Sequence, residues 1–140
     1  MTMAKVFRCM EFRILPTQDQ KVLIWKTFGC RRWIWNHLLA ERIDSNKQLG
    51  GTKFINTTPA HFRKDPENAF LKEVDSLALS NTQLNVSQAC TRQFARGKTP
   101  RFLSKSRQKR RYTTNCVNGN IYIEQGSYTD SFIRLPKPER

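Results

Sequence analysis

The chain has 140 residues, of which 38% are hydrophobic and 11% aromatic, enough for one ordinary domain or two small lobes with a core. Its 25 lysines and arginines outnumber 11 acidic residues, so the formal net charge is +14. This balance favours nucleic acid as the partner ahead of an anionic membrane. No apolar run approaches the ~20 residues of a membrane span, and no apolar signal region begins the chain, so we expect a cytoplasmic protein without a membrane partner.

The first fifteen residues have the alternating pattern of a strand. Val6, Met10, Phe12 and Ile14 share one parity within 5–15, and Pro16 follows them. The pattern therefore predicts a strand that ends at the proline.

A capping box begins the next element. Thr17 and Gln20 can satisfy each other's free backbone N–H groups at a helix start, which predicts a first helix to about Phe28, ended by Gly29. A second helix is expected over 30–44. Two helices around a short turn are typical of a helix-turn-helix, although any antiparallel helical pair has the same pattern.

The middle of the chain predicts further short and long helices. Residues 46–57 are polar and predict a mobile loop. Thr58-Pro59 and Asp65-Pro66 each place a capping residue before a proline, which predicts two short helices. Ser76 is then expected to cap a longer helix that ends near Arg96, before Gly97.

The period changes after Pro100. Strands are expected over 111–117 and 120–124, joined at Asn118-Gly119, and again around Phe132, Ile133 and Leu135. A single first strand needs partners, so we expect it to pair with these strands. The fold class is therefore α+β: residues 1–16 and 100–140 form a small antiparallel β-barrel-like domain, and residues 17–99 form an inserted helical domain.

A basic tract extends from residue 92 to 111. It has nine cations and no acidic residue, with Phe94, Phe102, Leu103 and Tyr112 interleaved. These apolar anchors favour an ordered surface for a phosphate backbone, and a merely solvated basic face is the alternative. The candidate backbone-binding residues are Arg92, Arg96, Lys98, Arg101, Lys105, Arg107, Lys109, Arg110 and Arg111.

The residue pattern predicts no catalytic residue, metal site or cofactor. The four cysteines lack a C-x-x-C pair, so we interpret them as packed, reduced thiols. The carboxylates do not form the cluster that two divalent metals require, so this chain alone is not expected to be an enzyme.

Several collinear segments together resemble the N-terminal part of the TnpB/OrfB family, which comprises transposon-encoded RNA-guided nucleases related to type V CRISPR effectors. The segments are 12–20 (FRILPTQDQ), 27–31 (TFGCR), 35–42 (WNHLLAER), 71–79 (LKEVDSLAL), 100–105 (PRFLSK), 112–113 (YT) and 133–136 (IRLP).

The resemblance implies a wedge-like β-domain and a helical recognition domain that bind guide RNA and target DNA, including a short flanking motif. The matching positions for motif reading are Phe54, Ser76, Ser80 and Asn118. Helix capping by Ser76 and turn formation by Asn118 are equally good explanations of those two residues.

Aromatic and amide side chains add two expectations. Trp35 and Tyr112 are candidates for stacking on nucleic acid. Asn36 is expected to form a structural hydrogen bond.

The family's RuvC-like nuclease domain follows this region, and the sequence ends at Arg140, so we expect that domain to be absent from this chain or supplied by a separate chain. The alternatives are a stand-alone DNA-binding regulator that uses the helical pair, and a truncated TnpB-derived interaction or inhibitor protein.

Overall fold

The computed structural model describes residues 4–49, 58–106, 109–126 and 130–136. The elements follow in the order α1 (Gln18–Leu49), α2 (Pro59–Arg63), the 3₁₀ helix η1 (Pro66–Glu73), α3 (Ser76–Ala95), β1 (Tyr122–Gln125) and β2 (Ser131–Arg134). The structure is α+β and mostly helical, with a two-stranded antiparallel sheet that does not close. A barrel is therefore not present among the described residues.

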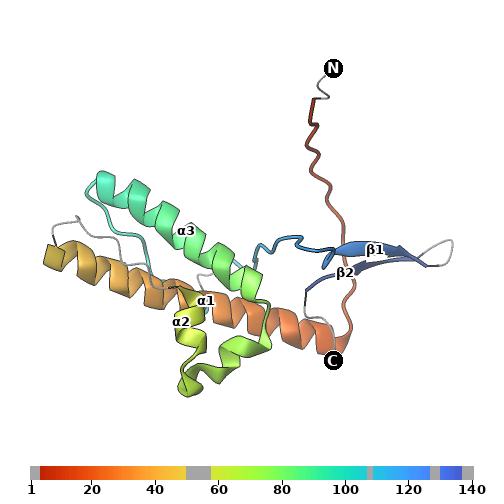
Figure 1. The fold of residues 1–140 in the computed structure, drawn as a ribbon, viewed down its shortest axis with the longest axis horizontal. Coiled ribbons are helices and arrows are strands. Elements are labelled where there is room, and N and C mark those ends of the chain that lie inside the picture. The colour runs from red at the N-terminus through yellow and green to blue at the C-terminus, as the bar shows by residue number, and fades with distance from the viewer. Residues whose placement is uncertain (1–3, 50–57, 107–108, 127–129, 137–140) are drawn as a thin grey trace.

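The long helices α1 and α3 run side by side in the same direction, and α2 and η1 connect them on the other side of α1 (Figure 1). Their interface is the core of the molecule. It contains Cys30, Ile34, Leu38 and Leu39 of α1, Leu71 and Val74 around η1, and Leu79, Val86 and Cys90 of α3. Most of the spacings among the residues of α1 and α3 are four or seven positions, as for one face of a helix.

The predicted break at Gly29 is wrong, because α1 continues through it to Leu49. A glycine ends a helix when it adopts a positive φ, and Gly29 is not among the glycines that do. Thr27 and Cys30, on either side of it, are both buried in the core. Packing of this face therefore outweighs the cost of about 1 kcal/mol for a glycine inside a helix. Residues 46–49, expected in a loop, are also helical.

The predicted helix starts are confirmed in part: Thr58 precedes α2 but makes no side-chain cap hydrogen bond. The Thr17 N–H donates to Gln20 Oε1 at 2.8 Å, and the Gln20 N–H donates to Thr17 Oγ1 at 3.4 Å, as in a capping box. Asp65 caps η1 by accepting from the Glu67 N–H. The cap of α3 was misplaced by one residue: Asp75, rather than Ser76, accepts from the Leu77 N–H at 3.0 Å.

The end of α3 forms a Schellman motif. The Lys98 N–H donates to the Gln93 carbonyl at 2.8 Å, and the Gly97 N–H donates to the Phe94 carbonyl at 3.0 Å. Gly97 has φ +68°, so the predicted glycine stop is confirmed at this helix end.

The turn at Asn118-Gly119 is present, but the strand before it is not. Asn118 and Gly119 have φ values of 53° and 71°, as in a type I′ turn. Residues 111–117 form no strand, because Tyr112 packs on α1 and the Thr114 hydroxyl donates to Asp75. β1 instead pairs with β2, with Ile123 opposite Ile133.

The predicted first strand is also wrong. Residues 4–17 have no regular structure and extend away from the helices (Figure 1). Alternation alone does not supply a pairing partner, and the described strands β1 and β2 pair only with each other. The apolar side chains that were expected to pack together are exposed in both regions: Val6, Met10, Phe12 and Ile14 at the N-terminus, and Ile123, Phe132 and Ile133 in the sheet.

Candidate nucleic-acid interface

The basic tract begins on α3 and returns along α1. Arg92 lies in the last turn of α3, Arg96 caps its end, and Lys98 belongs to the Schellman motif. The chain then passes back beside α1 toward the sheet (Figure 1). Every described cation of the tract is exposed: Arg92, Arg96, Lys98, Arg101, Lys105, Lys109, Arg110 and Arg111. Arg107 lies outside the described residues.

The first attachment of the tract to α1 is made by two adjacent side chains of the helix. The Asn36 amide donates to the Leu103 carbonyl at 2.9 Å, and its oxygen accepts from the Leu103 N–H at 2.7 Å. The Trp35 indole N–H donates to the Arg101 carbonyl at 3.1 Å. These three hydrogen bonds fix the backbone of 101–103, which leaves the Arg101 and Lys105 side chains in solvent.

The second attachment is aromatic and lies nearer the start of α1. Tyr112 packs edge-on against Phe28 with ring centroids 5.9 Å apart, and Phe28 packs edge-on against Trp25 at 5.7 Å. The Arg110 guanidinium lies 4.5 Å from the Trp25 ring centroid, a cation–π contact. The tract is therefore held at both ends of a path along one side of α1.

Two arginines of α1 extend the positive surface and were not among the predicted site residues. Arg31 and Arg32 lie between the two attachments, one helical turn from Phe28 and one from Trp35. Burial, followed by the nearby Arg111 guanidinium, lowers the pKa of Arg31. The spacing of both arginines from Phe28 and Trp35 places them on the same side of α1 as the two attachments. The sequence did not show that the basic tract would cover this side, because the tract lies about 70 residues further along the chain.

The two predicted stacking residues serve first as anchors. Trp35 is half-buried against the core and engaged with the tract. Tyr112 is half-buried too, and burial together with the nearby Asp75 carboxylate raises the pKa of its phenol. Trp25, in contrast, is 50% exposed.

Two of the predicted motif-reading residues, Ser76 and Ser80, lie at the start of α3. Ser76 begins α3, and Ser80 is exposed one turn later, with its hydroxyl donating to the Ser76 carbonyl at 3.1 Å. The Thr114–Asp75 hydrogen bond ties the segment before the Asn118 turn to the same end of α3. Asn118 is exposed in the turn that follows four residues after Thr114. Phe54 lies outside the described residues.

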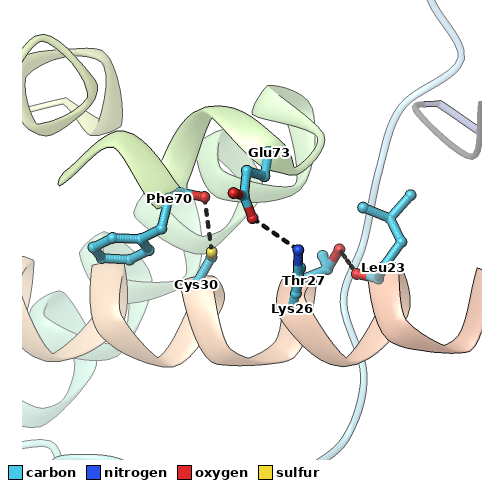
Figure 2. A network of polar contacts seen from close by, with 6 residues as sticks. All are labelled: Leu23, Lys26, Thr27, Cys30, Phe70 and Glu73. Carbon is cyan, nitrogen blue, oxygen red and sulfur yellow. Dashed lines mark hydrogen bonds and ion pairs between the residues drawn. The ribbon is translucent and has the colours of Figure 1, made fainter. Parts of the chain in front are cut away.

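Cys30 belongs to the core on the other side of α1. Its thiol points toward the Phe70 carbonyl at 3.7 Å, beside the Lys26–Glu73 ion pair of 3.1 Å (Figure 2). Burial, followed by the Glu73 carboxylate, raises the pKa of Cys30 to about 11, so the thiol is protonated at neutral pH. Cys90 is also buried, but Cys9 and Cys116 are exposed, so the prediction of packed thiols is correct for only two of the four.

The described ranges contain no group of three or more His, Cys, Asp or Glu side chains that could hold a metal ion. Within those same ranges, no helix is long and apolar enough to cross a membrane.

Residues 3–51 match a helix-turn-helix domain of the OrfB/IS605 family. This range covers the N-terminal segment and α1. In the described part of that range, a single long helix occupies the place where two helices and a turn were expected.

The chain is also 32% identical over 130 residues to a proposed RNA-guided DNA endonuclease of Streptomyces pristinaespiralis. That alignment covers 86% of this chain and 32% of the relative, so the chain spans about a third of the length of the curated protein it matches. The two matches confirm the resemblance to the TnpB/OrfB family, and they support a nucleic-acid-binding role.

Proposed function

We propose that this chain is the nucleic-acid-binding lobe of a TnpB-like RNA-guided DNA endonuclease, which binds guide RNA and target DNA through their phosphate backbones. The observation that carries the proposal is the basic tract, attached to α1 at two points with its described cations in solvent. Such contacts position a nucleic acid without reading its sequence. In an RNA-guided system, base pairing between guide RNA and target DNA supplies the sequence specificity. The protein therefore needs only contacts with the backbone over most of the bound nucleic acid.

A short flanking motif is the only sequence that this lobe would read itself. Ser80 and Asn118 are exposed; Ser80 lies in the first turns of α3, and Asn118 follows Thr114, which donates to Asp75 at the same helix start. Their short polar side chains suit contacts with base edges in a groove. Phe54 and Ser76 remain part of the proposed reading set by family resemblance.

The β-barrel-like domain belongs to the same proposal. The N-terminal segment and the β1–β2 sheet both expose large apolar side chains, among them Phe12, Ile123 and Phe132. A closed wedge-like domain over 1–16 and 100–140 would bury them in the assembled nuclease. We further propose that catalysis resides in a RuvC-like domain rather than in the residues described here.

The stand-alone regulator is less well supported. It depends on a recognition helix that follows a turn, and α1 supplies one uninterrupted helix over 18–49. No observation specifically favours an interaction or inhibitor protein.

The salt dependence of oligonucleotide binding tests the proposed function. We expect binding of a single-stranded 12-mer to weaken steeply with salt, because each phosphate contact releases a counterion. The double variant Lys105→Ala/Lys109→Ala should lower the slope of log K against log salt by roughly 1.4, about 0.7 for each lost contact.

The control double variant Lys64→Ala/Lys72→Ala removes the same charge from exposed positions on the α2–η1 side. It should keep the wild-type slope. Equal slopes of log K against log salt in the wild type and both double variants would show that the tract is not part of the interface. Absence of oligonucleotide binding at low salt would overturn the proposed function.

A further inference from the structure

Trp25 is a large aromatic side chain that the core does not explain. Half of its surface is exposed, whereas Trp33 and Trp35 pack against the core. It lies on the side of α1 that the basic tract crosses, so a flat apolar ring is displayed within a strongly positive surface. Aromatic rings in positive surroundings are the usual platforms on which single-stranded nucleic acids stack their bases.

The neighbours of Trp25 supply the rest of a nucleotide site. Phe28 and Tyr112 fix the backbone of 110–112 across α1, which holds the Arg110 guanidinium 4.5 Å from the Trp25 ring centroid. Arg111 lies between Arg110 and Tyr112, and Arg31 lies one helical turn beyond Phe28, so the same crossing brings two cations that repel each other to one side of α1. A phosphate bound by both arginines would relieve that repulsion, and a guanidinium plane is itself a stacking surface for a base.

We propose that Trp25 and Arg110 form a stacking site for one unpaired base of a single-stranded nucleic acid, and that Arg31 and Arg111 bind the adjoining phosphate. The inference rests on the proposed function and adds a stacking contact between Trp25 and a base, which phosphate binding alone does not require. The base is unpaired because bases within a duplex already stack on both sides. The site takes any base, since every base has a π-face.

The rival explanation is that Trp25 only anchors Arg110 and thereby orders the tract. The two explanations differ in what reaches the ring. A stacked base quenches tryptophan emission and adds an affinity term that salt does not remove. If Trp25 only anchors Arg110, its replacement alters the position of that charge. Oligonucleotide binding then leaves the emission of Trp25 unchanged, because no base contacts the ring.

The test uses the full chain with dT12, rU12 and a blunt 12-base-pair duplex. We expect dT12 and rU12 to quench wild-type emission, and the quench to disappear in Trp25→Phe. Trp25→Ala should weaken binding of the single strands about tenfold at every salt concentration, with an unchanged salt slope. Its affinity for the duplex should equal that of the wild type. Trp33→Phe, at a ring stacked on His37, is the matched control and should keep both the quench and the affinity.

Single strands that bind with steep salt dependence, but with no Trp25-dependent quench and no loss in Trp25→Ala, would overturn the stacking site and leave the proposed function intact. Absence of any oligonucleotide binding by the wild type would overturn both. If Trp25→Ala fails to fold by circular dichroism, the quench comparison between wild type and Trp25→Phe decides the question.

Discussion

Single side chains attach the basic tract to α1, and Asn36 is the clearest of them. Its amide both donates to and accepts from the backbone of Leu103, so it replaces the partners that a neighbouring strand would offer. A structural hydrogen bond was predicted for Asn36 from the sequence. Its partner was not predicted, because 67 residues separate the two and helical periodicity carries no information about so distant a segment.

Asn36→Ala should therefore release the tract locally. We expect the free energy of unfolding to fall by about 1–2 kcal/mol, because two part-buried hydrogen bonds are lost. The Leu103 amide should lose its protection from hydrogen exchange. Oligonucleotide binding should weaken several-fold, since ordered charge is replaced by mobile charge.

Asn81→Ala is the matched control for this change. Asn81 is also half-buried, but its amide donates to the Leu77 carbonyl of its own helix at 3.0 Å. It should leave the exchange of the Leu103 amide unchanged. Full protection of Leu103 in Asn36→Ala would show that other contacts hold the tract.

The tryptophan that best suits base stacking differs between the sequence and the structure. The sequence favoured Trp35 for stacking on nucleic acid. The structure gives Trp35 a hydrogen bond to Arg101 and leaves Trp25 half exposed. The pattern of a helix identifies its core face, but it does not identify which other face a later segment will cover.

At the scale of elements, the backbone conformation of two glycines determines whether a long helix continues or ends. Gly29 lies inside α1, and a Cβ added there would meet nothing within 4 Å. Gly97 ends α3 with φ +68°. The same residue type was interpreted as a helix end in both places, and only the backbone conformation distinguishes them.

Substitution by alanine should move stability in opposite directions at these two sites. Gly29→Ala should raise the free energy of unfolding by about 0.5–1 kcal/mol, because alanine favours the helix and finds open space. Gly97→Ala should lower it by about 1–2 kcal/mol, the cost of a left-handed conformation for a residue with a Cβ. Urea denaturation of both variants measures the difference. Destabilisation by Gly29→Ala would indicate that α1 bends at this residue.

The strands show the limit of local patterns most clearly. Asn118-Gly119 was predicted as a tight turn and forms one, since its two positive φ values are a local property. Pairing is not local. Residues 111–117 are engaged by α1 and α3, so β1 takes β2 as its partner, and the predicted first strand has no neighbour among the described strands.

At the scale of the molecule, the sequence predicted the helical middle of the chain, the two strands near its end and the basic tract, but it divided α1 into two helices and expected strands over 5–15 and 111–117 that are absent. It did not predict that the tract would return along α1 and combine with Arg31 and Arg32 into one surface. We propose that this surface is the nucleic-acid interface. It joins residues 25–36 with 101–112, two segments that are distant in sequence and adjacent in the fold.

Ultraviolet cross-linking of the chain to a short single-stranded RNA, with the adducts mapped by mass spectrometry, tests this claim most directly. Adducts should concentrate in the two joined segments, at Trp25 above all, because zero-length cross-links form at aromatic rings that contact bases. The α2–η1 side, which also carries exposed aromatic and basic residues such as Phe70 and Lys64, should remain largely free of them. Adducts that concentrate on the α2–η1 side and spare residues 25–36 and 101–112 would show that nucleic acid binds elsewhere on the protein.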